Sequence, residues 1–223
     1  VKDANGGGAT MALGGGNKAD YTLRTSMIGI NNTVTGANRA ESADNLVMGV
    51  GNTASNVQHL TAIGSKNTVS DAKNTVIVGD NRKVTGANNS VIIGSSDAET
   101  TTTVNDAVAI GHNTEVSAEG GVALGSKSKA TVAAGAAGYD ISTKAASTDT
   151  SSTWKATASA VSVGDVANDV TRQITSVAAG TNDTDAVNVA QLKKVETKIS
   201  TVEADAKKHT TVIAGANTTV TSG

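Results

Sequence analysis

Short apolar runs that end in glycine recur along the first 125 residues of the chain. Eight of them can be read directly: MALGG, SMIGI, LVMGV, TAIGS, VIVGD, VIIGS, VAIGH and VALGS. Their glycines are Gly14, Gly29, Gly49, Gly64, Gly79, Gly94, Gly111 and Gly125, and successive glycines are separated by 15, 20, 15, 15, 15, 17 and 14 residues. Another small or apolar residue follows most of these glycines at a distance of five residues. The pattern predicts repeated units of two short strands joined by a polar turn.

The repeat predicts an all-β solenoid. Its apolar runs are rich in β-branched residues, as in NTVIVGD and NSVIIGS, which favours strands covered on at least one face. Glycine after each run suits a tight corner that requires positive φ or close backbone approach. One unit cannot bury its own apolar side, whereas stacked coils bury it and pair their backbones. We therefore expect about eight coils, on the order of 40 Å tall at one strand spacing per coil.

Two of the repeats are longer than the others. The extra residues fall at 36–45, between Gly29 and Gly49, and at 95–106, between Gly94 and Gly111. Insertions into a solenoid emerge as surface loops, and such loops often carry binding. The alternative is that the solenoid merely tolerates them, because lengthening a loop costs little entropy.

A short amphipathic helix is predicted near the C-terminal end. Its apolar positions follow one another at steps of three and four, typical of a heptad seam. The seam residues are Leu192, Val195, Ile199, Val202, Ala206 and His209. Two and a half heptads are too few for a stable isolated helix, so the seam predicts a bundle organised by the preceding segment 175–188. Asp183 or Thr184 is the expected N-cap. After His209 the chain returns to alternating Thr and Val, which predicts the start of a further β module.

Composition favours association over a lone compact monomer. The 223-residue chain has no Phe, Pro or Cys, one Trp and two Tyr, so it buries little apolar area per residue. Its net charge of −2 indicates neither a disordered polyelectrolyte nor a basic nucleic-acid surface. The chain starts at Val1, without a signal segment or an apolar run of membrane-spanning length, and we expect it to be a fragment of a longer protein.

Several segments resemble one bacterial protein family. Residues 161–196, VSVGDVANDVTRQITSVAAGTNDTDAVNVAQLKKVE, resemble the neck of trimeric autotransporter adhesins. The units NSVIIGS, AVAIGHN and GVALGSKSKA resemble coils of the YadA-like heads of that family, and residues 136–156 resemble an insertion between the last coil and the neck. The residues that match the neck are Arg172, Gln173, Ile174, Ala186, Val187, Asn188, Val189, Ala190, Gln191 and Leu192.

The resemblance implies an architecture. Each of three identical chains would form a left-handed parallel β-roll, which departs from the usual right-handed crossover, and a neck would thread each chain to a neighbour before a trimeric coiled coil. Small Ala and Val side chains would allow close approach at the threefold axis. The implied domains are a head over 1–135, with loop insertions at 36–45 and 95–106, an insertion with Trp over 136–160, a neck over 161–190, a stalk segment over 191–209 and a further β module over 210–223.

The resemblance also implies a function. The chain would be the head of a bacterial surface adhesin, held at the outer membrane by a C-terminal barrel outside this sequence. Its partners would be host cell-surface receptors, including those of the carcinoembryonic-antigen type, or extracellular-matrix proteins, together with other copies of itself. Three copies of each loop would sum weak contacts into avidity. The loop residues that we expect to contact a receptor are Arg39, Glu41, Asp44, Asp97 and Glu99.

Motifs for enzymatic chemistry fail on their context. GVGNTA at 49–54 satisfies GxGxxA, but a dinucleotide site needs a following helix, and a polar turn and a strand are expected here. His59, His112 and His209 lie far apart without further ligands at metal-binding spacing. We therefore expect no enzyme activity, no cofactor and no bound metal.

Two aromatic residues and two other functions remain as alternatives. Tyr139 and Trp154 are expected to cap the open edge of the last coil, with receptor contact as the alternative. A hexapeptide-type acyltransferase would need an aliphatic residue at the place of Thr75 and a period in multiples of six. An ice-binding solenoid would need a threonine ladder, and TTTT at 100–103 is a local run.

Overall fold

The structure, a computed structural model, describes residues 8–38, 42–208, 215–217 and 219. The chain divides into two compact units, Val1–Arg172 and Gln173–Gly223. Arg39, Glu41 and His209 lie outside the described residues, as does most of the segment 210–223.

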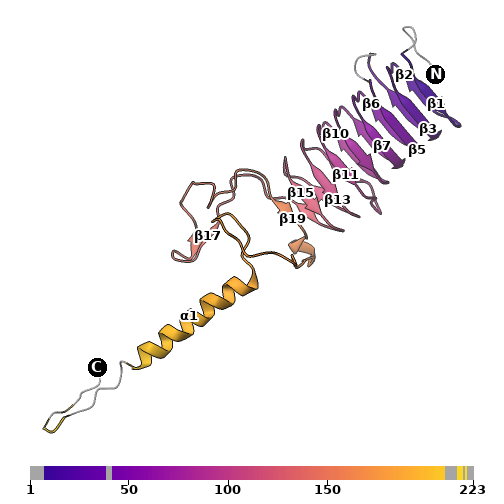
Figure 1. Ribbon diagram of the computed structural model, residues 1–223. Helices are drawn as coiled ribbons and strands as arrows, with labels where there is room; N and C mark the ends of the chain where they lie inside the picture. Colours follow the sequence, from indigo (N-terminus) through magenta and orange to yellow (C-terminus); the bar gives the residue numbers. More distant parts are fainter. Residues whose placement is uncertain (1–7, 39–41, 209–214, 218, 220–223) are drawn as a thin grey trace. The chain divides into compact units, whose positions relative to one another are not determined.

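The first unit is a parallel β-solenoid, which confirms the predicted fold class (Figure 1). Each coil gives one strand to a nine-stranded sheet and, in the first six coils, one to a six-stranded sheet. In spatial order the larger sheet consists of β1 (Met11–Leu13), β3 (Ser26–Ile30), β5 (Leu46–Val50), β7 (Thr61–Ser65), β9 (Val76–Val78), β11 (Val91–Ile93), β13 (Val108–Ile110), β15 (Val122–Leu124) and β19 (Val161–Ser162). The smaller sheet consists of β2 (Lys18–Asp20), β4 (Thr33–Thr35), β6 (Thr53–Ser55), β8 (Thr68–Ser70), β10 (Arg82–Thr85) and β12 (Thr100–Thr102). The left-handed winding stays a prediction.

The smaller sheet ends at the coil that carries the second insertion. Beyond β12, the strands β14 (Glu115–Val116) and β16 (Lys129–Ala130) form a separate two-stranded sheet. The backbone ladder on this side of the roll is therefore interrupted between β12 and β14.

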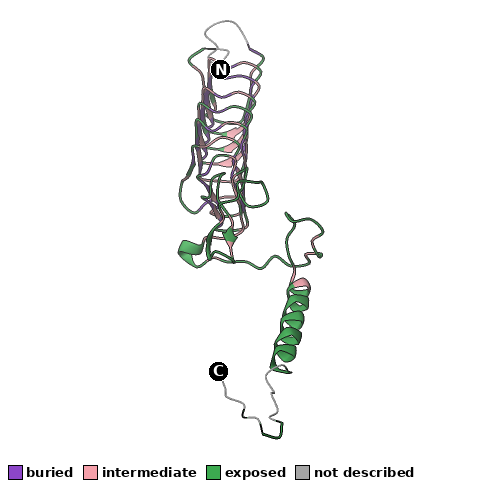
Figure 2. Cartoon of the chain, turned by 90° about the vertical axis from the view of Figure 1, so that its left-hand side faces the viewer, coloured by how far each residue is buried: buried purple, intermediate pink, exposed green. Residues whose placement is uncertain are grey.

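The core lies between the two sheets and is built from small aliphatic side chains (Figure 2). Buried and more exposed residues alternate along most of the strands, because successive side chains of a strand point to opposite faces. Ala62, Ala109 and Ala123 are each at most 1% exposed in this interior. These three alanines therefore fill the inside of the roll, and the placement of small side chains at a threefold axis stays a prediction.

A ladder of buried asparagines runs along one corner of the roll. In the coil of Asn52, the side-chain amide nitrogen donates to Asn32 Oδ1 at 2.9 Å and to the carbonyl oxygen of Gly64 at 2.7 Å. Asn67 repeats both bonds one coil later, to Asn52 and to Gly79. These bonds satisfy polar groups that burial would otherwise leave unpaired.

The segment after the last coil forms a small hairpin and then closes the larger sheet. Strands β17 (Tyr139–Asp140) and β18 (Ala145–Ala146) pair antiparallel. Tyr139 is 65% exposed and Trp154 is 38% exposed. Strand β19, rather than this aromatic pair, covers the last strand β15, with Val122 opposite Val161. The expected aromatic cap is therefore wrong within this chain. A 3₁₀ turn, η1 (Val166–Asn168), follows.

The second unit contains the helix α1 (Val189–Lys208). Its N-cap is Asn188, whose Oδ1 accepts the backbone N–H of Gln191 at 3.1 Å, while Gln191 Oε1 accepts the backbone N–H of Asn188 at 3.2 Å. This reciprocal pair is a capping box. The expected cap at Asp183 or Thr184 is wrong, because these residues lie in the preceding loop. Among the described residues, no helix is both long and apolar enough to cross a membrane.

Candidate functional site

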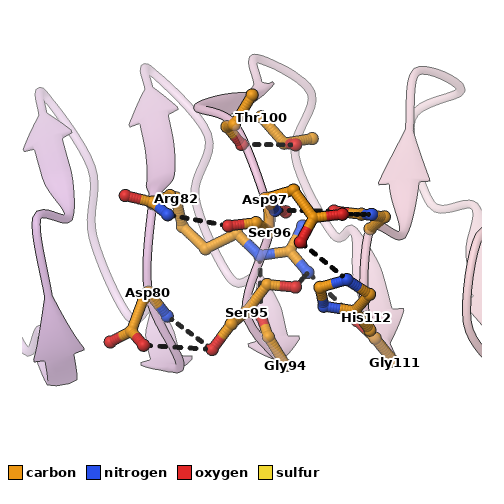
Figure 3. Close-up of polar contacts among 12 residues, drawn as sticks. Asp80, Arg82, Gly94, Ser95, Ser96, Asp97, Thr100, Gly111 and His112 are labelled. Carbon is orange, nitrogen blue, oxygen red and sulfur yellow. Dashed lines mark hydrogen bonds and ion pairs between the residues drawn. The ribbon is translucent and has the colours of Figure 1, made fainter.

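The second insertion is fixed to the next coil through Asp97. Its backbone N–H donates to Asn113 Oδ1 at 2.9 Å, and its Oδ2 accepts the side-chain amide of Asn113 at 2.7 Å. His112 Nε2 lies 3.2 Å from Asp97 Oδ1, as Figure 3 shows. The hydrogen bond from Asn113, followed by that from His112, holds the pKa of Asp97 below its usual value. Asp97 thus presents its carboxylate at the surface in a fixed orientation.

Glu99 in the same insertion pairs with the preceding coil. Its carboxylate lies 3.4 Å from Lys83 Nζ on β10, and both side chains are about half exposed, at 51% and 41%. Exposed pairs of this kind contribute at most about 1 kcal/mol. Both charged residues predicted in this insertion therefore have a partner within the chain, one on each side of the loop.

The first insertion contains one described candidate, Asp44. Arg24 on the preceding coil donates from Nε and Nη2 to the two carboxylate oxygens of Asp44, at 2.5 and 2.7 Å. This bidentate pair lowers the pKa of Asp44 and raises that of Arg24. His59 Nε2 lies 4.0 Å from the same carboxylate on the following coil. These residues line part of a surface cavity of about 520 Å³.

The two insertions do not come together. The first lies in the connection from β4 to β5, which leads from the smaller to the larger sheet. The second begins in the connection from β11 to β12, which leads back from the larger to the smaller sheet, and its residues 95–99 leave the roll there before the chain enters β12. They therefore leave the roll at opposite edges, so a single small partner would contact only one of them on a given chain.

The outer face of the larger sheet carries a continuous row of aliphatic side chains, here called the outer apolar stripe. The row consists of Leu13, Ile28, Met48, Ile63, Val78, Ile93, Ile110 and Leu124, which occupy one register position from coil to coil. Leu13 is 61% exposed and Ile93 is 40% exposed. A contiguous exposed apolar surface of this length is typical of an interaction site.

The outer face of the smaller sheet is polar instead. Its central part, here called the hydroxyl face, consists of Thr33, Thr35, Thr53, Ser55, Thr68 and Ser70. These side chains stand in two rows, in register over three coils, and Lys18 and Lys83 flank one row. The threonines that stand in register from coil to coil, Thr33, Thr53 and Thr68, are therefore not those of the TTTT run at 100–103. The two outer faces therefore differ in chemistry, since one is aliphatic and the other carries hydroxyl groups.

Arg172 of the predicted neck closes the end of the first unit. Its guanidinium donates to Ser128 Oγ at 3.1 Å, to the carbonyl oxygen of Ser126 at 2.6 Å and to that of Val163. Nearby, Lys129 lies 3.2 Å from Glu115 and 3.7 Å from Asp165, and these carboxylates raise the pKa of Lys129, Glu115 most strongly. A cavity of about 790 Å³ lies beside this network.

The remaining neck and seam residues belong to the second unit and are largely exposed in one chain. Ile174 is 73% exposed and Val187 is 71% exposed. Along the helix, Leu192, Val195, Ile199 and Val202 are between 54% and 63% exposed. These apolar side chains form a surface that the described part of the chain leaves uncovered.

No cluster in the described ranges resembles a metal or cofactor site. No group of three or more His, Cys, Asp or Glu side chains that could hold a metal ion is found there. The GxGxxA match at 49–54 spans the corner between β5 and β6, where a strand follows rather than a helix. That context lacks the helix N-terminus to which a dinucleotide phosphate would bind.

Sequence reasoning found the insertions but missed the partners of their charged residues. Arg24, Lys83 and Asn113 were not singled out, and His112 was considered only as a metal ligand, although His112 and Asn113 lie about one coil length after Asp97. The asparagine ladder also has a sequence signal that was missed. Asn17, Asn32, Asn52 and Asn67 each follow a corner glycine by three residues.

Comparison with known proteins gives three matches. The family described as "Coiled stalk of trimeric autotransporter adhesin" matches residues 173–219. "Autotransporter adhesin BadA" of Bartonella henselae is 56% identical over 79 residues, which is 35% of this chain and 3% of that protein. "Trimeric autotransporter adhesin AtaA" of Acinetobacter sp. (strain Tol 5) is 50% identical over 78 residues, 34% of this chain and 2% of that protein. The chain thus spans only a small part of the length of these two relatives.

Proposed function

We propose that the chain is part of a trimeric autotransporter adhesin, in which it forms the head, the neck and the start of the stalk of a bacterial adhesive fibre. The head covers 1–135, the insertion 136–160, the neck 161–190, the stalk segment 191–209 and a further β module 210–223. In this proposal the parent protein holds the fibre at the outer membrane, and the chain acts by binding rather than by catalysis.

We propose that three copies associate through the outer apolar stripe and the helix seam. The stripe is the observation that carries this proposal. Ile93, Ile110 and Leu124 are each at least 36% exposed in one chain, and a threefold assembly would bury them against their copies. Fully burying an exposed Ile or Leu side chain contributes about 1.5–3 kcal/mol. Because the stripe side chains are already partly buried in one chain, each would add a fraction of this value, and eight positions per chain would together add stability to a core rich in alanine and valine.

The hydroxyl face and the two insertions would then point outward. Asp44, Asp97 and Glu99 remain the candidate receptor contacts, together with Arg39 and Glu41 of the first insertion. Asp44 and Glu99 pair with Arg24 and Lys83, and Asp97 is held by the side chains of Asn113 and His112, so a receptor would meet oriented, partnered carboxylates rather than free ones. Each chain presents one first and one second insertion, so a trimer presents three of each and gains avidity from weak contacts.

The proposed partners are host cell-surface receptors, including the carcinoembryonic-antigen type, extracellular-matrix proteins, and other copies of the fibre. The near-neutral net charge of −2 gives no basic footprint for nucleic acid. Binding would therefore depend on shape and local charge pairs rather than on long-range attraction.

Solution mass and binding test the proposal together. Light scattering of the purified chain should give three times the 22.0 kDa of one chain, and a folded monomer at micromolar concentration would contradict the trimer. Binding of the trimer should then be measured on a panel of matrix proteins and epithelial receptors. A trimer that binds none of them and does not self-associate would contradict the adhesive role.

Two further variants locate the contact. Deleting residues 98–99 and 37–41 restores the 15-residue spacing of the other coils in both insertions. Loss of binding in this trimer would place the contact on the insertions. Unchanged binding there, with loss in a Thr53→Ala, Thr68→Ala trimer, would place the contact on the hydroxyl face.

A further inference from the structure

Arg82 is a cation in the core of the roll. The residue begins β10 and is 2% exposed, and it makes no ion pair with any carboxylate in the described residues. Burying a charge without an opposite charge is unfavourable, and burial lowers the pKa of this guanidinium. The hydrogen bonds that its donors make therefore have to offset the cost of burying this charge.

The guanidinium reaches two successive coils. Its Nε donates to the carbonyl oxygen of Gly94 at 2.7 Å, and Nη1 donates to the carbonyl oxygen of Thr114 at 2.8 Å. Nη2 donates to the carbonyl oxygen of Gly111 at 3.0 Å and to Thr114 Oγ1 at 3.2 Å. A weaker contact of 3.4 Å leads to the carbonyl oxygen of Ser95. Figure 3 shows the side chain of Arg82 extended toward the labelled residues Gly94, Ser95 and Gly111.

Arg82 occupies the next position of the asparagine ladder. Its backbone N–H donates to Asn67 Oδ1 at 3.0 Å, as the backbone N–H of Asn67 does to Asn52. Each ladder asparagine also donates to the carbonyl oxygen of the corner glycine of the next coil, which lies 12 residues later for Asn52 and Asn67, and Arg82 Nε does the same to Gly94. Arg82 thus reproduces two of the ladder bonds, the one from its backbone N–H to the preceding ladder residue and the one from its side chain to the next corner glycine.

The terminal nitrogens of Arg82 donate the hydrogen bonds that the residue in register on the following coil does not supply. The residue in register with Arg82 on that coil is Thr100, which lies in the second insertion. Its hydroxyl turns to the carbonyl oxygen of Ala98 at 3.4 Å, so it does not continue the ladder. The carbonyl oxygens of Gly111 and Thr114 are instead reached by Arg82, from one coil further back.

The same side chain crosses the interruption in the smaller sheet. No strand pairing joins β12 to β14, whereas β10 pairs with β12 and β14 pairs with β16. Arg82 lies on one side of this break and Thr114, directly before β14, on the other. The loop also begins inside the roll, because Ser96 is 3% exposed and its carbonyl oxygen accepts the side-chain amide of Asn81 at 2.7 Å.

We propose that Arg82 is the positioning residue of the 95–106 loop: it replaces two rungs of the asparagine ladder and fastens the coil that carries the loop to the next coil. The functional part of this inference, that the loop is thereby presented to a partner, rests on the proposed adhesive function. The structural part stands on the contacts alone.

Hydrogen exchange of the intact trimer tests the structural part. In Arg82→Asn, the Gly94 carbonyl keeps a donor, whereas both bonds to Thr114 are lost. Loss of bonds to a charged group should make the amides of 95–106 and 111–116 exchange at least about tenfold faster, with the coils of β3 to β8 unchanged. Lys83→Gln is the matched control, because it removes only the surface pair with Glu99, and it should change exchange less than about threefold.

A second variant covers the case in which Arg82→Asn does not fold. Arg82→Lys keeps the charge but offers one donor group instead of a planar fork. The lysine ammonium should reach one of the acceptors, so the amides of 95–106 should exchange at a rate between those of the parent protein and Arg82→Asn. Exchange identical to that of the parent protein in either variant, or an equal increase in every coil, would overturn the proposal.

Adhesion of the same variants separates this inference from the proposed function. Faster loop exchange together with weaker receptor binding supports both. Faster loop exchange with unchanged binding supports the role of Arg82 and counts against the loop as the adhesive contact. Unchanged loop exchange overturns the role of Arg82 whatever the binding result.

Discussion

Gly49 and Gly64 stack directly on one another at successive corners of the roll. They are register partners in β5 and β7, with φ angles of +126° and +138°. A Cβ built on Gly49 would lie 1.8 Å from the carbonyl oxygen of Gly64, where no real Cβ can stand. The glycine column is thus required for contact between coils as well as for the left-handed backbone conformation.

Gly49→Ala should destabilise the roll strongly. The change adds a steric conflict with the next coil to the strain of positive φ, which together should cost about 2–5 kcal/mol. Gly51→Ala is the matched control, since Gly51 has φ of +67° and a Cβ added there would meet nothing within 4 Å. It should cost about 1–2 kcal/mol. Thermal unfolding of both variants measures the difference, and equal costs would show that the column is not sterically closed.

A charge on the outer apolar stripe should break the trimer. Ile93→Asp combined with Ile110→Asp places two carboxylates on neighbouring strands β11 and β13, where association would have to bury them. We expect light scattering to show the trimer mass replaced by smaller species. Thr53→Asp combined with Thr68→Asp makes the same chemical change on the hydroxyl face and should leave the trimer intact. The opposite pattern would place the interface on the smaller sheet.

Acid should release Asp97 from Asn113. The pKa of Asp97 is lower in the folded chain than in the unfolded chain, so the folded state binds fewer protons. The stabilisation from this contact is therefore complete above the unfolded value of about 3.9 and is lost as the pH falls through the lower folded value. The side-chain amide resonances of Asn113 should report this transition below about pH 4. In Asp97→Asn the transition should vanish, and its persistence would assign it to another group.

Removing the helix cap should loosen the stalk start. Asn188→Ala removes the acceptor of the Gln191 N–H and also the bond from Asn188 Nδ2 to the carbonyl oxygen of Val177 at 3.2 Å. We expect a loss of about 0.5–2 kcal/mol, seen as a lower midpoint for thermal loss of helical circular dichroism. Asp183→Ala should be silent, because Asp183 does not cap the helix. A larger effect at Asp183 than at Asn188 would contradict the observed capping box.

The sequence by itself determined the elements of this protein and their order. The glycine at the corner of each coil and the three-and-four spacing from Leu192 to Val202 are local signals, because they depend on residues within a few positions of one another. The solenoid and the helix α1 followed from them. Even the ladder was visible in principle, since Arg82 is the first residue to break a run of asparagines three positions after a glycine.

Only the tertiary structure decided which residues of different coils contact one another. Asp97 meets Asn113 and Arg82 meets Thr114 across 16 and 32 residues, distances over which no sequence pattern fixes a contact. The structure also placed the two insertions at opposite edges and set the apolar and hydroxyl rows on different sheets. The physical reason is that stacking brings residues one coil apart in the sequence to within one strand spacing of each other. The insertions change the number of residues per coil, so the residues that become neighbours are known only from the register of the folded chain.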